Sequence, residues 1–348
     1  MVEREELARD TSGQVVHTPV LLDRIVELLS PPLRGDSSMA SSKWGGPVYV
    51  DGTLGMAGHA AAILAANPRA RLVGIDRDEQ ALQIAAIQLE PFGPRVHLVH
   101  ARFDELPAVL DRLGLSSIDA MLLDLGLSSL QIDRRERGFS YSVDAPLDMR
   151  MDERQALTAA AVLNCYQERD LVRVLRDYGE EKFSGRIARA IVARRNDDPF
   201  TNSAQLVAAI EEAIPAAVRY TGGHPAKRTF QALRIEVNGE LDALRAVLPS
   251  ALLRLAVGGR FAVLAYHSLE DRMVKRAFAQ AASDQVPPDL PFVPEGLKAE
   301  MRLLTRGAEK PSVEEVAVNP RAASARLRCV ERIRPPRTSN SRHQERSR

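Results

Sequence analysis

The stretch of sequence that decides the fold reads VYVDGTLGMAGH, residues 48–59. A β-branched apolar run ends at Asp51, and a loop with three glycines spaced three residues apart leads into an alanine-rich segment. Glycine lets the backbone turn sharply and approach a ligand closely, because it has no Cβ. A second apolar run, LVGI at 72–75, ends at Asp76, an acid suited to a ribose hydroxyl pair. The pattern predicts a nucleoside-binding crevice at the carboxyl ends of parallel strands.

The spacing of the glycines indicates which nucleoside binds. A dinucleotide fingerprint reads G-x-G-x-x-G and places a pyrophosphate on the helix N-terminus. This chain reads D-G-x-x-G-x-x-G, with an acid directly before the first glycine. That acid would repel a pyrophosphate but suits an ammonium or sulfonium charge, and S-adenosylmethionine carries both. We expect S-adenosylmethionine, with a NAD-dependent oxidoreductase as the alternative.

Bulk composition is that of an ordinary globular protein. The chain has 348 residues, enough for about two domains, with 45% hydrophobic and 27% charged residues and a net charge of +1. Two cysteines cannot build a disulfide framework, which fits a reducing cytoplasm. The sequence has no apolar run of about 18 residues and no signal-peptide pattern at its start. We therefore expect a cytoplasmic protein without a membrane span.

The expected elements alternate as in a parallel sheet until Asp124, and helical patterns follow. The expected strands are 48–51, 71–76, 96–100 and 118–124, and the helices between them are 57–66, 78–89 and 104–113. Amphipathic segments without a β-like run follow at 158–164, 168–178, 181–195 and 203–214. The sheet pattern resumes with helices at 226–237 and 240–256 and strands at 260–266 and 325–332. This order predicts an α/β sheet domain with an inserted all-helical domain.

The domain limits follow from these patterns. We expect a flexible leader at 1–16, the sheet domain at 17–133 and 225–334, the helical insertion at 134–224 and a basic disordered tail at 335–348. A helix is expected from residue 17 to about 29, stopped by Pro31 and Pro32. The segment 35–46 has few apolar residues and is interpreted as a flexible insertion.

Three side chains near the expected strand ends are candidates for the site. Asp124 follows the fourth strand and faces the crevice, or else caps nearby amides. Phe103 could cover an adenine face or belong to the core. His59 could cap a helix or contact the ligand. The seven histidines form no ligand-spaced cluster with acids or cysteines, so we expect no metal.

The segment YHSLEDR at 266–272 lies where a strand gives way to a helix. Ser268 is a good N-cap, with Asp271 three residues later. Capping does not explain why Tyr266 and His267 stand at the crevice end. A Ser-His-acid hydrolase is the other interpretation, but the chain has no G-x-S-x-G elbow.

Basic side chains cluster on two expected helices. On the helix at 226–237, the pattern leaves Arg228 and Arg234 on a polar face, which is either solvated or holds RNA phosphate. Arg186 and Arg189 belong to a basic stretch of the inserted helices. We take these four arginines as candidates for RNA binding.

Taken together, the motifs resemble those of the RsmH (MraW) family of bacterial S-adenosylmethionine-dependent methyltransferases, from about residue 17 to 333. The matching motifs include HTPVLL (17–22), DGTLGMAGH (51–59), LLDLGLSS (122–129), PLDMRMD (146–152) and GGRFAVLAYHSLEDRMVK (258–275). The resemblance implies a Rossmann-like class I methyltransferase sheet with a helical insertion. It implies N4-methylation of a cytidine in the decoding region of 16S rRNA, with that rRNA in the small ribosomal subunit as partner, and leaves a homodimer open.

The resemblance also implies roles for individual residues. It implies cofactor contacts from Ala57, Gly58, His59, Asp76, Phe103, Asp124 and Gln131. Asp76 would take the ribose hydroxyls and Phe103 would lie near adenine. Two positions depart from the family pattern, because Ala57 stands where glycine is frequent and Tyr266 where phenylalanine is common.

The expected chemistry is attack of a cytosine amino nitrogen on a sulfonium-bound methyl group. Acceptors for the N–H groups would stabilise the positive charge that develops on nitrogen. We expect Asp124, or the adjoining carbonyls, and His267 to accept these protons. A non-catalytic RNA-binding factor in ribosome assembly is a further alternative, which the intact cofactor loop disfavours.

Overall fold

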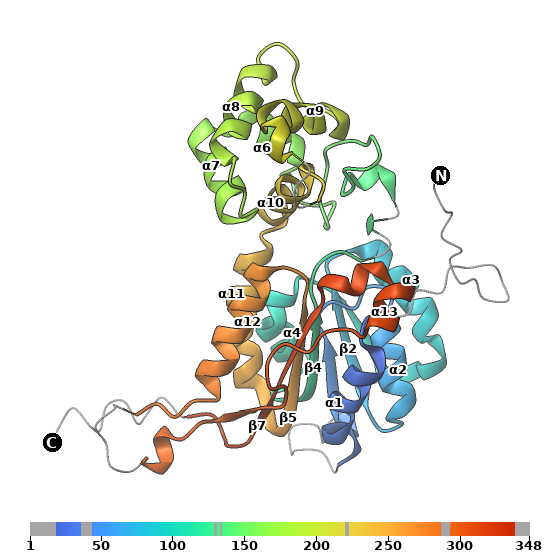
Figure 1. The fold of residues 1–348 in the computed structure, drawn as a ribbon. Coiled ribbons are helices and arrows are strands. Elements are labelled where there is room, and N and C mark those ends of the chain that lie inside the picture. The colour runs from blue at the N-terminus through green and yellow to red at the C-terminus, as the bar shows by residue number, and fades with distance from the viewer. Residues whose placement is uncertain are drawn as a thin grey trace. The chain divides into compact units, whose positions relative to one another are not determined.

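The computed structural model describes residues 19–35, 44–128, 131–132, 134–219, 223–286 and 293–337 (Figure 1). These residues divide into two compact units. The sheet unit takes the described residues up to Asp76, Gln80–Gly126 and those from Ala246 onward. The helical unit takes Arg77–Glu79 and Leu127–Arg245. The expected leader at 1–16, residues 36–43 of the expected insertion and residues 338–348 of the expected tail lie outside the described residues.

The sheet unit is built on a seven-stranded sheet with the order β3-β2-β1-β4-β5-β7-β6. The strands are β1 (Val48–Asp51), β2 (Arg71–Asp76), β3 (Val96–His100), β4 (Ile118–Asp124), β5 (Leu255–Ala265), β6 (Met301–Leu303) and β7 (Arg326–Arg332). The first five are parallel neighbours, and β7 runs antiparallel to both β5 and β6. This confirms the expected Rossmann-like α/β fold, and the first four strands have the expected limits. The sequence did not predict β6.

Helices cover both faces of this sheet, because successive strand residues alternate sides. The helices of the sheet unit are α1 (Leu22–Arg34), α2 (Gly58–Ala66), α3 (Glu79–Leu89, most of it), α4 (Leu106–Arg112), α12 (Ser268–Ala281), α13 (Val313–Val318) and the later part of α11 (Glu240–Arg254). Tyr49 and Leu122 belong to the core that packs under α1, α2 and α3. Phe261 points to the other face, where its ring meets Phe278 of α12 at 5.4 Å.

Helix α1 corrects one expectation. Pro31 and Pro32 lie inside it, and the helix continues to Arg34 instead of ending near residue 29. Pro32 has no N–H for the carbonyl of Leu28, four residues earlier. The Arg260 guanidinium on β5 donates to that carbonyl at 2.7 Å and so replaces the missing donor. A tertiary hydrogen bond therefore lets the helix pass the two prolines.

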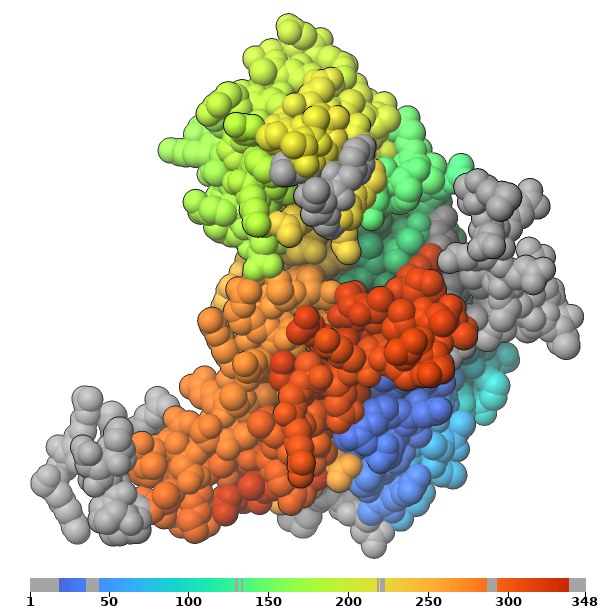
Figure 2. Space-filling model, viewed as in Figure 1, coloured from blue at the N-terminus to red at the C-terminus, as the bar shows by residue number. Residues whose placement is uncertain are grey.

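The C-terminal part of the sheet unit lies against the start of α1. The Arg24 guanidinium on α1 pairs with Glu309 at 2.8 Å, and the Leu21 amide donates to Glu315 on α13 at 2.6 Å. In Figure 2 the red segment around α13 borders the blue surface of α1. These contacts join residues almost 300 positions apart and fix the beginning of the unit.

The helical unit consists of α6 (Ala159–Cys165), α7 (Glu168–Asp177), α8 (Ser184–Arg195), α9 (Ser203–Ala213), α10 (Ala226–Asn238) and the start of α11. Side chains cap the N-termini of two of these helices. The Thr158 side chain accepts a hydrogen bond from the Ala161 amide, and the Asn202 side chain accepts one from the Gln205 amide. Helix α10 contributes Phe230 and Leu233 to the common apolar core. The unit therefore extends to Arg245, beyond the 134–224 expected from sequence. No helix in the described part of the chain is long and apolar enough to span a membrane.

Candidate functional site: the carboxyl ends of the parallel strands

Three acids end three neighbouring strands of the sheet unit. Asp51 on β1 lies in register with Gly74 of β2 and Leu122 of β4. Asp76 and Asp124 are the last residues of β2 and β4. Because the carboxyl ends of parallel strands meet at one edge of the sheet, the three carboxylates lie at that same edge. This arrangement makes the edge negatively charged, as expected from the sequence.

Asp51 is the most deeply buried of the three acids. It is 2% exposed, and burial raises its pKa to about 6, although nearby His59 and two hydrogen bonds act in the opposite direction. The Tyr49 hydroxyl donates to its Oδ2 at 2.9 Å, and the Thr53 amide donates to its Oδ1 at 3.2 Å. Asp51 therefore supports the loop from beneath and does not present a free carboxylate to a ligand. This corrects the expectation that the acid before the first glycine faces the positive charge of the ligand.

The loop from Gly52 to Ala57 packs tightly against the strand ends. A Cβ on Gly52 would lie 2.5 Å from Leu123 Cδ2, so any larger residue there would displace the Leu123 side chain. The Gly55 amide donates to Asp76 Oδ2 at 2.7 Å, which ties the loop to the end of β2. Ala57 is fully buried and has a positive φ of 68°, a conformation that costs an L-residue about 1–2 kcal/mol.

Asp124 contacts side chains from two other elements. Its Oδ1 accepts a hydrogen bond from the Tyr266 hydroxyl at 2.9 Å, and its Oδ2 lies 3.6 Å from His59 Nδ1. Its own amide donates to Thr53 Oγ1 at 2.6 Å. Burial raises the pKa of Asp124, while His59 and the Tyr266 hydroxyl act in the opposite direction. The side chain is nevertheless about a quarter exposed, so it can meet a substrate.

His59 is buried beside Asp124 at the start of α2. Its Nε2 lies 2.9 Å from the Val20 carbonyl oxygen, and the side chain is 7% exposed. A carbonyl oxygen only accepts hydrogen bonds, so Nε2 must carry the hydrogen. The contacts of His59 are therefore with the protein, and its Nδ1 is directed at Asp124.

His267 caps helix α12 and does not contact Asp124 in the described structure. Its side chain accepts from the Glu270 amide, and the His267 amide donates to Glu270 Oε2 at 3.2 Å. Its Nε2 lies 3.2 Å from Glu270 Oε1. This corrects the expectation that Ser268 is the N-cap with Asp271 as its partner. The geometry favours a capping role for His267 over the acceptor role expected from sequence.

The remaining expected cofactor residues fall in both units. Phe103 is half-buried and lies beside the loop, since a Cβ on Gly52 would sit 3.3 Å from Phe103 Cβ. Gly58 begins α2 under Pro19. Gln131 belongs to the helical unit, where its amide donates to the buried Asp78 at 3.2 Å. The structure thus gathers Ala57, Gly58, His59, Asp76, Phe103 and Asp124 in the sheet unit.

The arginine candidates for RNA binding differ in accessibility. Arg186, Arg189 and Arg228 are exposed. Arg234 instead forms a mostly buried ion pair with Glu240 at 2.8 Å. The expected polar face of α10 is covered only toward its C-terminal end, where Asn238 is buried and accepts a hydrogen bond from the Met151 amide at 2.8 Å. Arg234 is therefore withdrawn from the set of candidates.

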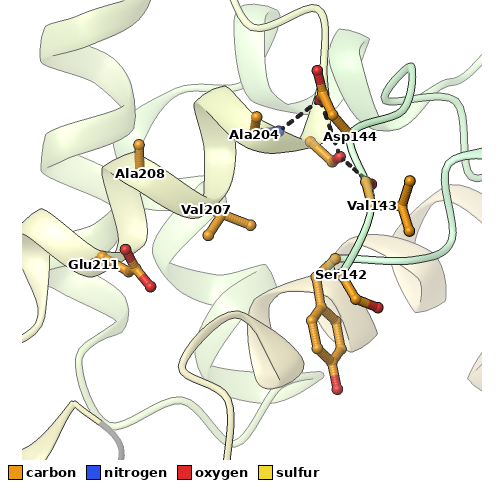
Figure 3. Close-up of a pocket in the computed structure, with 9 residues that line it drawn as sticks. Ser142, Val143, Asp144, Ala204, Val207, Ala208 and Glu211 are labelled. Atoms are coloured by element: carbon orange, nitrogen blue, oxygen red, sulfur yellow. Dashed lines mark hydrogen bonds between the residues drawn. The ribbon is translucent and has the colours of Figure 1, made fainter. Parts of the chain in front are cut away.

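The helical unit also contains a shallow pocket of about 340 Å³ between residues 141–144 and α9 (Figure 3). At one end Asp144 accepts a bond from the Ala204 amide at 3.0 Å, and Glu211 lies further along α9. None of the expected cofactor residues lines this pocket. Among the described residues, no group of three or more His, Cys, Asp or Glu side chains could hold a metal ion.

The Tyr49 hydroxyl was not predicted from the sequence, and Tyr266 was expected at the crevice end without an identified partner. Tyr49 precedes Asp51 by two residues and so lies on the same side of β1, which the strand period could have shown. The bond from Tyr266 to Asp124 joins residues 142 positions apart. No local pattern indicates that second contact.

Known proteins match this chain over most of its length. A model of the MraW methylase family matches residues 14–333. The Ribosomal RNA small subunit methyltransferase H of Cutibacterium acnes is 59% identical over 331 residues, covering 94% of this chain and 96% of that protein. The protein of the same name from a Nocardioides species is 57% identical over 316 residues, covering 91% and 96%.

The raised pKa of Asp51 predicts a pH-dependent stability difference between the wild type and Asp51→Asn. The folded protein holds the proton up to about pH 6, whereas the unfolded chain releases it near 3.8, so this carboxyl destabilises the fold increasingly as pH rises between those values. From pH 4.5 to 7.5, the variant should gain about 2 kcal/mol relative to the wild type. Urea unfolding at a series of pH values measures this. Asp242→Asn, at an exposed acid, should track the wild type, and parallel curves for Asp51→Asn would contradict the assignment.

Proposed function

This chain belongs to the MraW methylase family, and we propose that it is the S-adenosylmethionine-dependent enzyme that methylates N4 of a cytidine in the decoding region of 16S rRNA. The small ribosomal subunit would be its substrate, and the cytoplasm its location. The observation that carries the proposal is the family match over residues 14–333, together with the carboxylates of Asp76 and Asp124 at the ends of β2 and β4. Full-length relatives named as small-subunit rRNA methyltransferases support the choice of substrate.

The strand ends fit the proposed methyl donor. S-adenosylmethionine supplies a methyl group on a positively charged sulfur, and the carboxylates of Asp76 and Asp124 supply a negative environment for it. A pyrophosphate would meet these same carboxylates unfavourably. We propose that Asp76 binds the ribose hydroxyls and that Phe103 lies near the adenine, with Ala57, Gly58 and His59 completing the site in the sheet unit.

Asp124 is the proposed acceptor for the amino protons of the cytidine. Its carboxylate is partly exposed and is oriented by the Tyr266 hydroxyl at 2.9 Å. Bonding the N–H groups favours the more nucleophilic geometry of the amino nitrogen and stabilises its developing charge. Much of the remaining rate comes from alignment of the reacting atoms. His267 supports this region as the cap of α12.

Arg186, Arg189 and Arg228 are the proposed contacts to rRNA phosphate. Arg186 and Arg189 lie on α8 one helical turn apart, and both are exposed. Arg228 donates to the Glu180 carbonyl at 2.8 Å and remains exposed. Exposed guanidinium groups bind phosphates and make the affinity dependent on salt.

A methyl-transfer assay tests the function directly. The full chain is incubated with labelled S-adenosylmethionine and 30S subunits, naked 16S rRNA or DNA, and the nucleosides are analysed by mass spectrometry. We expect N4-methylcytidine from a small-subunit substrate. Binding of NAD in place of S-adenosylmethionine would indicate an oxidoreductase, and RNA binding without methyl transfer would indicate an assembly factor.

Asp76→Ala should weaken S-adenosylmethionine binding by about 10- to 100-fold, because charge-assisted hydrogen bonds to the ribose are lost. Isothermal titration calorimetry measures the affinity. Asp76→Asn keeps an acceptor for the Gly55 amide and separates loop support from the negative charge. Asp111→Ala, at an exposed acid on α4, is the control. Affinity within twofold of wild type for Asp76→Ala would rule out the ribose assignment.

Reversal of charge at Arg186 and Arg189 should weaken rRNA binding and reduce its dependence on salt. Two lost phosphate contacts should lower the slope of log K against log salt by about 1.5. Filter binding at several salt concentrations gives that slope. The exposed Arg245→Glu on α11 is the matched control. An unaltered slope for the double variant would remove this surface from the RNA interface.

A further inference from the structure

The two oxygens of the Asp124 carboxylate meet groups from two different elements. Oδ1 accepts from the Tyr266 hydroxyl, which follows β5, at 2.9 Å. Oδ2 faces Nδ1 of His59 on α2 at 3.6 Å. The hydroxyl therefore sets the rotation of the carboxylate, and this rotation directs the second oxygen at the imidazole.

The tautomer of His59 follows from its other contact. Nε2 must carry a hydrogen because it faces the Val20 carbonyl at 2.9 Å. In the neutral imidazole, Nδ1 then has a lone pair, and this lone pair is directed at Asp124 Oδ2. The ring is buried and held at Nε2, so it keeps this orientation. His59 is thus placed to receive a proton that first reaches Asp124.

On the basis of the function proposed above, we propose that His59 receives, through Asp124, the proton that the cytidine N4 loses, and that Tyr266 holds Asp124 for this transfer. As the N4–carbon bond forms, the carbon–sulfur bond breaks, sulfur keeps the electron pair, and one N4 proton passes to Asp124. Asp124 then returns to its ionised form by giving the proton to His59 Nδ1. Both His59 and Tyr266 act through Asp124 and are positioning residues.

The 3.6 Å between Asp124 Oδ2 and His59 Nδ1 is longer than a normal hydrogen-bond distance. An approach of about 0.6 Å brings the two atoms to bonding distance, and catalytic hydrogen bonds often tighten when substrate binds. The other ionisable groups near this pair are Asp51 and Tyr49 on β1, the Tyr266 phenol and Glu270 on α12. The two phenols are neutral, and the carboxylates favour a proton held within this group of side chains.

Two variants test the inference. His59→Gln keeps an N–H group that can donate to the Val20 carbonyl but cannot take up a proton. We expect its single-turnover rate to fall at least about tenfold. In the wild type the rate should rise with pH as Asp124 and His59 lose protons, and this rise should be absent from the pH–rate profile of the variant. Tyr266→Phe should reduce the rate about 3- to 10-fold and move this rise to higher pH, because the carboxylate loses a hydrogen bond that stabilises its ionised form. The exposed His97→Gln on β3 is the matched control.

A measurement on the free protein supplies a second readout. Long-range nitrogen–proton NMR spectra distinguish the histidine tautomers, and His59→Gln identifies the His59 signals by their loss. We expect neutral His59 to carry its hydrogen on Nε2. An Nδ1–H tautomer in the wild type would overturn the inference without any enzymatic assay.

The outcomes separate this inference from the proposed function. If the wild type transfers no methyl group to any rRNA substrate, the proposed function fails. If the wild type is active and both variants keep its rate and pH profile, the proton route fails while the function stands. Calorimetry with S-adenosylmethionine and a thermal melt accompany each variant. Tyr266→Phe keeps the ring and removes only the hydroxyl, so this variant still tests the inference if His59→Gln does not fold.

Discussion

The meeting of three carboxylates at one sheet edge is the constraint on which the rest of the site depends. Parallel strands ending in Asp51, Asp76 and Asp124 concentrate negative charge, and the protein offsets each acid differently. Asp51 is buried and accepts a hydrogen bond from the Tyr49 hydroxyl, and Asp76 accepts one from the Gly55 amide. Asp124 accepts a hydrogen bond from the Tyr266 hydroxyl and lies close to His59. Most of these partners are neutral donors, which leave negative charge in place. A positively charged methyl donor suits such an edge, and a phosphate does not.

A second constraint operates in the helical unit, where a buried polar network holds a long loop. The Asn238 amide donates to the Met149 carbonyl at 2.7 Å, and its oxygen accepts from the Met151 amide. The buried Arg137 guanidinium bonds Asp78 and the Met151 carbonyl, each within 3.1 Å. Buried polar groups are costly unless they are bonded, so these partners determine one path for the loop. Helix α10 thereby anchors the unit through polar contacts as well as apolar ones.

Features of the fold that depend on local sequence were predictable, and features that depend on contacts between distant residues were not. The limits of the first four strands were predictable, because each is an apolar run that ends in a polar or turn residue. The passage of α1 through Pro31 and Pro32 was not predictable, since it depends on the distant Arg260. Arg234 was expected on a polar face, but it pairs with Glu240 and is mostly buried. Helical periodicity indicates which residues share a face and does not indicate what covers it.

The two histidines nearest the strand ends show how capping and proton transfer exclude each other in one ring. His267 accepts from the Glu270 amide, so a proton on that acceptor nitrogen would break a cap that is typically worth about 1 kcal/mol. Its other ring nitrogen lies 3.2 Å from Glu270 and would share any proton with that carboxylate. His59 is held through its Nε2 hydrogen, and a proton on Nδ1 leaves that bond intact. His59 can therefore take up a proton without losing a contact to the protein, whereas His267 would lose the hydrogen bond with which it caps α12.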